Sequence, residues 1–197
     1  MKDKNGVCLL EILAVLAIIL ILAAIGSTLR EDFGTRKSVA QVRGDLSMIA
    51  TALEAYAADS GAFPFDIDSR GFPWFVTDVL STPVAYLSDT FLEDPFRAHI
   101  PSPREVRRYR YLNFPANAPP TGWPPSPYPG PFFTRFILPF QQSSIDTGMA
   151  VFGEWKLSSA GPDGGANTNF GSLELQYDPT NGTVSGGDII LSHRRRR

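Results

Sequence analysis

The chain has 197 residues, of which 43% are hydrophobic and 19% charged, a balance that allows a buried core and excludes wholesale disorder. Eighteen basic residues stand against twenty acidic ones, but four of the arginines form the terminal run 194–197. Without that run, 14 basic residues against 20 acidic ones give a net charge of −6, and we expect no nucleic-acid partner. The single cysteine, Cys8, excludes an internal disulfide framework and a zinc site built from several thiolates.

An apolar run begins close to the N-terminus. Residues 7–25 contain only two ionisable side chains, Glu11 and the thiol of Cys8, and the short polar leader before them carries Lys2 and Lys4. Because roughly 20 apolar residues span the hydrocarbon of a bilayer, the run indicates a membrane anchor or a secretion signal and disfavours a wholly soluble enzyme. Glu11 is anomalous in both interpretations, since a carboxylate in lipid is costly and is by default functional.

The stretch 6–19 resembles the class III signal of type IV pilin-like proteins. That signal has a short basic leader, a glycine before the cleaved bond, a glutamate fifth in the mature chain and an unbroken apolar helix. The resemblance implies that a prepilin peptidase cleaves the Gly6–Val7 bond and methylates the new N-terminus. It also implies that Glu11 pairs with the α-amino group of a neighbouring subunit, because two opposite charges in apolar surroundings need each other. Val7 departs from the phenylalanine that is usual in the family.

Apolar residues continue at helical spacing beyond this run. They form one face of an amphipathic helix and fall at Val39, Val42, Leu46, Ile49, Leu53 and Tyr56. Gly61 is a typical C-terminal stop, and Pro64 reinforces it. We therefore expect one long helix over residues 7–60, surrounded by lipid or filament core first and packed on a globular domain later.

The next segments resemble the pseudopilins of type II secretion systems. Residues 56–64 are similar to the end of the family's long helix, with a tyrosine, polar residues, a glycine and an aromatic-proline pair. Residues 80–87, 92–96 and 109–111 are similar, in order, to its short helix, its Asp-Pro-aromatic turn and its first strand. Alternation predicts a strand over 151–157, and further strands are expected over 173–177 and 188–191.

The expected fold class is therefore α+β and pilin-like, with a long N-terminal α-helix, membrane-spanning in its first half, packed on a small antiparallel β-sheet. Residues 1–6 are expected to be a leader peptide and residues 7–29 the hydrophobic helix of the membrane or filament core. Residues 30–197 are expected to form a periplasmic globular domain.

Two segments have unusual compositions. Residues 114–140 hold eight prolines between positions 115 and 131, which predicts an extended or looped insertion without a helix, pinned to the sheet by its aromatic residues. A contact patch for another subunit is the alternative. The tail 194–197 is expected to be a frayed basic end, with a contact to anionic lipid or an acidic neighbour left open. A solvated strand face is expected for Arg104, Arg107, Arg108 and Arg110.

The sequence offers little support for catalysis. It contains no Gly-x-Ser-x-Gly elbow, no His-Glu-x-x-His pair and no phosphate-binding glycine loop with a lysine. His99 lies in a proline-flanked loop and His193 beside the basic tail, so neither is expected to act as a base. Asp66 and Asp68 are expected to be solvated turn residues. We therefore expect that the protein is not an enzyme.

A hard cation is the best candidate ligand. Residues 159–164 resemble the segment that begins the calcium loop of the major, G-type pseudopilin, and residues 187–189 resemble the segment that ends it. The resemblance implies Ca²⁺ held by Asp163, Asp188 and the carbonyl of Ala160. Calcium takes about six to eight oxygens, and the long interval between the two aspartates leaves further ligands open. The alternative is a set of turns capped by Asp and Asn side chains without a metal.

Together, the segments resemble a structural subunit of a type II secretion pseudopilus. This implies a bacterial inner-membrane protein with a single pass and a periplasmic C-terminal domain. The implied partners are further copies of the chain, other pseudopilins, the prepilin peptidase, the inner-membrane secretion platform, and the membrane before assembly. A type IV pilin subunit is one alternative, although the paired-cysteine loop that would favour it is missing from the sequence. A membrane-tethered or secreted calcium-dependent binding module, not processed after Gly6, is the other.

Overall fold

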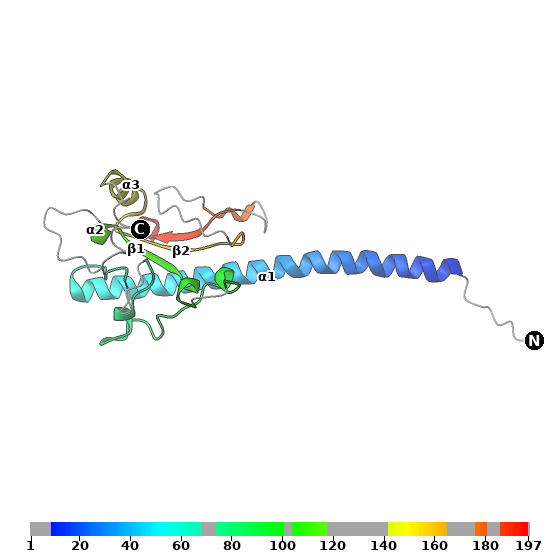
Figure 1. Cartoon of the computed structure of the whole chain (residues 1–197), viewed down its shortest axis with the longest axis horizontal. Coiled ribbons are helices and arrows are strands. Elements are labelled where there is room, and N and C mark those ends of the chain that lie inside the picture. Colours follow the sequence, from blue (N-terminus) through cyan, green and yellow to red (C-terminus); the bar gives the residue numbers. More distant parts are fainter. Residues whose placement is uncertain are drawn as a thin grey trace, which may run out of the picture. The chain divides into compact units, whose positions relative to one another are not determined.

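The computed structural model describes residues 9–67, 74–100, 104–117, 142–164, 176–180 and 186–196. The chain divides into two compact units, Met1–Lys37 and Ser38–Arg197. A long helix, α1 (Leu9–Ser60), begins in the first unit and ends in the second. Among the described residues, all the strands belong to the second unit, and the colours of Figure 1 show their order along the chain.

Helix α1 has the two-part character that the residue pattern predicts. Side chains from position 9 to position 26 are exposed, whereas Val42, Leu46, Ile49 and Leu53 are buried on one face of the later turns. The helix ends where Gly61 takes a positive φ of 78° and donates its N–H to the carbonyl of Ala57 at 2.8 Å. The expected helix and its glycine stop are confirmed over residues 9–61, while residues 7 and 8 lie outside the described part.

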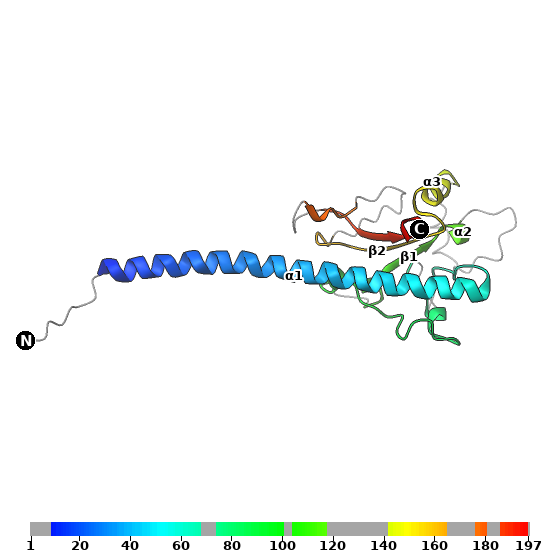
Figure 2. The ribbon, with the colours of Figure 1, turned by 180° about the vertical axis from the view of Figure 1, so that it is seen from behind.

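The sheet has three antiparallel strands in the order β1 (Arg110–Asn113), β2 (Trp155–Ser159) and β3 (Ile189–Ser192). Its register places Leu157 opposite Tyr111 on one side and Leu191 on the other. Figures 1 and 2 show the C-terminal half of α1 along one side of these strands and α3 (Gln142–Phe152) on the other. The α+β class with a small antiparallel sheet is confirmed.

The core lies between α1 and the sheet. Side chains from both layers meet in it, including Tyr109, Tyr111, Trp155 and Leu157 opposite the apolar face of α1. The outer edge of β1 is covered by short segments, because Tyr111 donates its N–H to the carbonyl of Trp74 at 3.1 Å. Just before β1, Asp94 donates its N–H to the carbonyl of Arg107 at 2.8 Å. These contacts place the turn that contains Asp94 beside the sheet.

The strand expected over 151–157 is wrong in its first half. Val151 lies in α3, which closes where Gly153 donates its N–H to the carbonyl of Met149 at 3.0 Å. Gly153 then reverses the chain with a φ of 84°, and the strand begins only at Trp155. Alternation over a few residues does not separate the last turn of a helix from a strand, because both leave apolar residues near the core.

The expectation that residues 114–140 hold no helix is wrong at its start. Helix α2 (Phe114–Asn117) includes Pro115, which the first turn of a helix tolerates because that N–H has no partner within the helix. Asn113 caps this turn, since its Oδ1 accepts the N–H of Ala116 at 3.1 Å. Residues 118–141, which hold the rest of the expected insertion, lie outside the described residues.

The arginines before β1 do not form a solvated strand face. Arg104–Arg107 form a 3₁₀ turn, and only Arg110 belongs to the strand. Arg108 is 2% exposed, and its guanidinium lies 4.9 Å from the ring centre of Phe75 and 5.2 Å from that of Phe91. A planar, weakly hydrated guanidinium is suited to such burial against aromatic faces, so that expectation is corrected.

The turn after α1 also departs from expectation. Asp66 is fully buried, and its carboxylate accepts the N–H of Asn113 at 3.4 Å. This residue therefore ties the segment after α1 to the end of β1 and is not a solvated turn residue; Asp68 lies outside the described residues. The strand expected over 188–191 is confirmed by β3 with a shift of one residue. Of the strand expected over 173–177, residues 173–175 are not described, and Gln176 forms an isolated bridge to Asp188.

Candidate functional site

The N-terminal part of α1 is long and apolar enough to cross a membrane. The segment Leu9–Gly26 has a mean hydropathy of 2.9, and none of it is buried inside the described chain. A secretion signal near an N-terminus can be equally apolar, so length and composition alone do not separate it from a membrane span. Gly6 and Val7, which frame the expected cleavage site, lie outside the described residues.

Glu11 lies in the first turn of this helix. With Ile12, Val15 and Leu16 it lines a shallow, apolar hollow of about 210 Å³ on the exposed part of the helix. The N-terminus of a helix carries a partial positive charge, which favours an acidic residue in this turn. In lipid or in a filament core, the same carboxylate also requires a nearby positive group, because desolvating a charge is costly.

The two ends of the expected calcium loop come together at the end of β2. The Oδ2 atom of Asp163 accepts the N–H of Gly187 at 3.1 Å. Gly161 has a φ of 68°, and a Cβ at this position would lie 2.0 Å from the carbonyl oxygen of Gly187. Only glycine allows that approach. The structure therefore brings the segments around Asp163 and Asp188 side by side although they are far apart in the sequence.

The oxygen donors at this junction are of the kind that binds a hard cation. Asp188 is 3% exposed and Ala160 is 2% exposed, whereas Asp163 is exposed. Carboxylate and carbonyl oxygens are the donors that calcium prefers. Within the described ranges, no group of three or more His, Cys, Asp or Glu residues could hold a metal ion. The two aspartates and one carbonyl thus fit calcium in kind, and further oxygens would have to complete its shell of about six to eight.

Sequence reasoning missed the contribution of Asp94 to this junction. Its fully buried carboxylate accepts the hydroxyl of Ser159 at 2.8 Å, the N–H of Ala160 at 2.8 Å and the N–H of Phe96 at 3.0 Å. Burial raises the pKa of the Asp94 carboxyl, although these hydrogen bonds and Arg97 act in the opposite direction. An Asp-Pro pair signals only a turn, so nothing local indicated these contacts with a segment 65 residues away.

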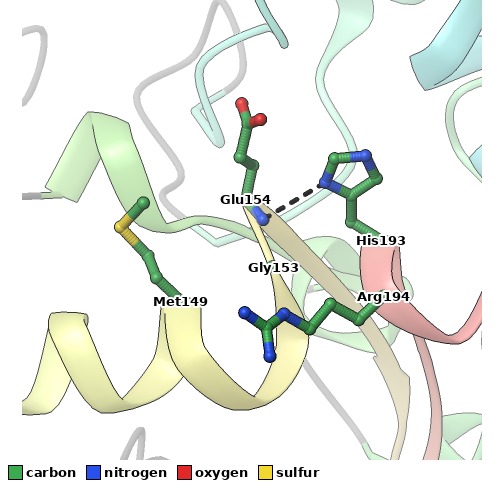
Figure 3. A pocket seen from close by; sticks show the side chains of 5 residues that line it. All are labelled: Met149, Gly153, Glu154, His193 and Arg194. Atoms are coloured by element: carbon green, nitrogen blue, oxygen red, sulfur yellow. Dashed lines mark hydrogen bonds between the residues drawn. The ribbon is translucent and has the colours of Figure 1, made fainter.

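A second hollow lies at the opposite end of β3. It has a volume of about 230 Å³ and is lined by Met149, Gly153, Glu154, His193 and Arg194 (Figure 3). The backbone N–H of Glu154 donates to Nδ1 of His193 at 3.4 Å, and Figure 3 shows the Glu154 carboxylate pointing away from the imidazole. The side chains drawn there do not converge on a common point.

His193 instead belongs to an aromatic cluster. Its ring stacks on Trp155 with 6.0 Å between ring centres and meets Phe63 edge to face at 5.3 Å. These contacts join the end of β3 to the segment that follows α1. The geometry supports an anchoring role for His193. His99 is exposed and lies beside Gly164, where an added Cβ would be 3.2 Å from Cε1 of the imidazole.

Comparisons with known proteins add nothing to these observations. No protein-family model, no curated protein and no solved structure matches the chain. The chain's own residue pattern and geometry therefore carry the inference about its function.

We predict that Gly161→Ala lowers the free energy of unfolding by about 2 kcal/mol or more, because the methyl group would overlap the carbonyl of Gly187 and strain a positive φ. Gly44→Ala is the matched control, since Gly44 lies on an exposed part of α1 with nothing within 4 Å of an added Cβ. The control is expected to be neutral or to gain up to about 1 kcal/mol. Urea unfolding of the detergent-solubilised chain, followed by tryptophan fluorescence, measures both. Equal losses in the two variants would contradict the close approach at Gly161.

Proposed function

We propose that this chain is a structural subunit of a type II secretion pseudopilus, held in the bacterial inner membrane by α1 with its C-terminal domain in the periplasm. One observation carries the proposal. A single helix begins with a strongly apolar segment of eighteen residues that the described chain leaves unburied, bears a glutamate in its first turn, and continues as one layer of a folded core. The proposal is of a structural protein without catalytic activity.

The glutamate distinguishes this proposal from a simple anchor. An anchor needs only apolar residues, and a carboxylate among them opposes insertion by about 3 kcal/mol. In a filament, cleavage after Gly6 would free the α-amino group of Val7, which supplies a positive partner for Glu11 of a neighbouring subunit. The same residue is therefore unfavourable in an anchor and useful in an assembly.

Assembly would then proceed through the helix. A prepilin peptidase removes the leader, the secretion platform extracts the subunit from the membrane, and the apolar segments of successive copies pack on one another in place of lipid. Other pseudopilins are the expected neighbours in the same filament. A type IV pilin subunit would use the same helix, but the single Cys8 supplies no paired-cysteine loop.

We predict that the mature protein begins at Val7 with a methylated α-amino group. Co-expression with a prepilin peptidase, followed by intact mass and N-terminal peptide mass spectrometry of the membrane fraction, measures this. Gly6→Trp is the matched variant and is expected to leave the leader attached, because a bulky side chain obstructs a site that needs an extended backbone. An unprocessed wild-type chain would support the membrane-tethered binding module, and a start near Gly26 would indicate a secretion signal.

We predict that Glu11→Val leaves processing and membrane insertion intact but reduces filament assembly at least about tenfold, since it leaves the α-amino group of Val7 without its partner in a low-dielectric core. Ile12→Leu, one position away on the same apolar segment, is the control and is expected to assemble normally. Sedimentation of sheared filaments from cells that express the secretion machinery measures assembly. Wild-type filament yields from Glu11→Val would refute the pairing role.

We also propose that the junction of residues 160–164 with residues 186–188 binds Ca²⁺ through Asp163, Asp188 and the carbonyl of Ala160. The adjacency of the two segments and the hard oxygen donors support this proposal. A cation there would gain most from the buried carboxylate of Asp188, because burial weakens the competition from water.

We predict that calcium at about 100-fold above its Kd raises the stability of the chain by about 2.7 kcal/mol, a melting shift of roughly 5 °C or more for a domain of this size. Magnesium is expected to do less, because it gives up its waters reluctantly. Differential scanning fluorimetry in detergent, with calcium or with a chelator, measures the shift. Asp163→Ala and Asp188→Ala should abolish most of it, and Asp89→Ala, an exposed turn residue, should not. Identical melting curves with calcium and with chelator would show that the junction is a set of turns without a metal.

A further inference from the structure

Asp94 occupies a position that its place in a turn does not explain. The residue caps a 3₁₀ turn (Pro95–Arg97) through the N–H of Phe96, which an exposed aspartate could do equally well. Its carboxylate is nevertheless fully buried, and it reaches across to the end of β2. Arg97 lies beside it, with Nε at 3.8 Å from Oδ2, and donates through Nη1 to the carbonyl of Val106 at 3.0 Å.

The contacts on the β2 side form a relay. Oδ2 of Asp94 accepts the N–H of Ala160 and Oδ1 accepts the hydroxyl of Ser159, both at 2.8 Å. The oxygen of the same Ser159 hydroxyl accepts the N–H of Gly161 at 3.4 Å. Two successive backbone N–H groups are thus held, one directly by the carboxylate and one through the serine.

The second of these N–H groups sets the direction of a carbonyl. The N–H of Gly161 and the C=O of Ala160 belong to one peptide unit, which is planar and trans, so the two groups point in opposite directions. Whatever holds the Gly161 N–H toward Ser159 therefore aims the Ala160 carbonyl to the other side. Gly161 itself is also restricted, because it has a positive φ and its backbone approaches that of Gly187 closely.

We propose that Asp94 is a positioning residue for the calcium site, which aims the Ala160 carbonyl at the ion through Ser159 and the Ala160–Gly161 peptide. This inference rests on the proposed function of the junction. Asp94 itself touches the backbone and Ser159 and contributes no oxygen to the ion. Its carboxylate suits the role because both oxygens accept hydrogen bonds here, whereas an amide would turn a donor toward one of the groups that donate to Asp94.

Two variants and a matched control test the proposal on the full-length chain in detergent. Asp94→Asn places an amide in the network, and Ser159→Ala removes only the relay while leaving the Asp94 carboxylate in place. Asp89→Asn is the control, because Asp89 accepts the N–H of Phe91 at 2.7 Å in the same i to i+2 geometry but is exposed. Calcium titration by calorimetry gives the Kd, and urea unfolding in a chelator gives the stability of the metal-free chain.

Asp94→Asn and Ser159→Ala are expected to weaken calcium binding by about tenfold or more while the chains are still folded, as loss of a partner behind a metal ligand does. Asp89→Asn is expected to leave the Kd unchanged. If both folded variants bind calcium as tightly as the wild type, with only the metal-free stability lowered, Asp94 is a structural residue and the inference is wrong, while the calcium site stands. If Asp94→Asn does not fold, Ser159→Ala decides. If the wild type itself binds no calcium, both the calcium site and the positioning role of Asp94 are refuted.

Discussion

The packing of one face of α1 against the sheet is the constraint on which the folded unit depends. The strands have only four or five residues each, and such a small sheet is not stable without a layer to cover it. Two buried tyrosines reinforce the contact: Tyr109 donates its hydroxyl to Asp45 on α1 at 2.7 Å, and Tyr111 donates to the carbonyl of Pro64 at 2.9 Å. Burial, with the neighbouring Asp45, raises the pKa of Tyr109, and burial raises that of Tyr111. Both phenols therefore stay protonated, and the donors remain in place at neutral pH.

The same helix has to satisfy two different environments. Its later turns are amphipathic because the sheet takes one face and water the other, whereas positions 9–26 are apolar all round and find no cover in the described chain. Lipid satisfies such a segment, and so do identical segments of neighbouring subunits. In the proposed function the segment passes from one environment to the other, and Glu11 is the side chain whose free energy differs most between them.

Buried polar groups organise the rest of the folded unit. Asp66 holds the end of β1, Arg108 lies against two aromatic rings, and Asp94 holds the end of β2. Each of them joins segments that are distant in the sequence, and each exchanges water for directed contacts with protein groups. Of the three, Asp94 bears on the start of the turn at residues 160–164, because it accepts the N–H of Ala160, and a buried hydrogen-bonded group tolerates little displacement. The proposed calcium site would thus rest on a rigid edge of the sheet, with glycines at the points where two backbones touch.

The sequence by itself determined the features that depend on near neighbours. The length of α1, the change in its character and its stop at Gly61 follow from a helical repeat and one residue's backbone freedom, and the apolar segment with Glu11 is legible from composition alone. Tertiary structure decided which polar residues are buried. Asp66, Arg108 and Asp94 all resemble surface residues in sequence, but they are buried. The local pattern around Val151 predicted a strand, whereas the structure has this residue in α3, which ends at the turn at Gly153. Their surroundings come from segments tens of residues away, and a charged side chain enters a core only when those distant groups supply its hydrogen bonds, which no local pattern records.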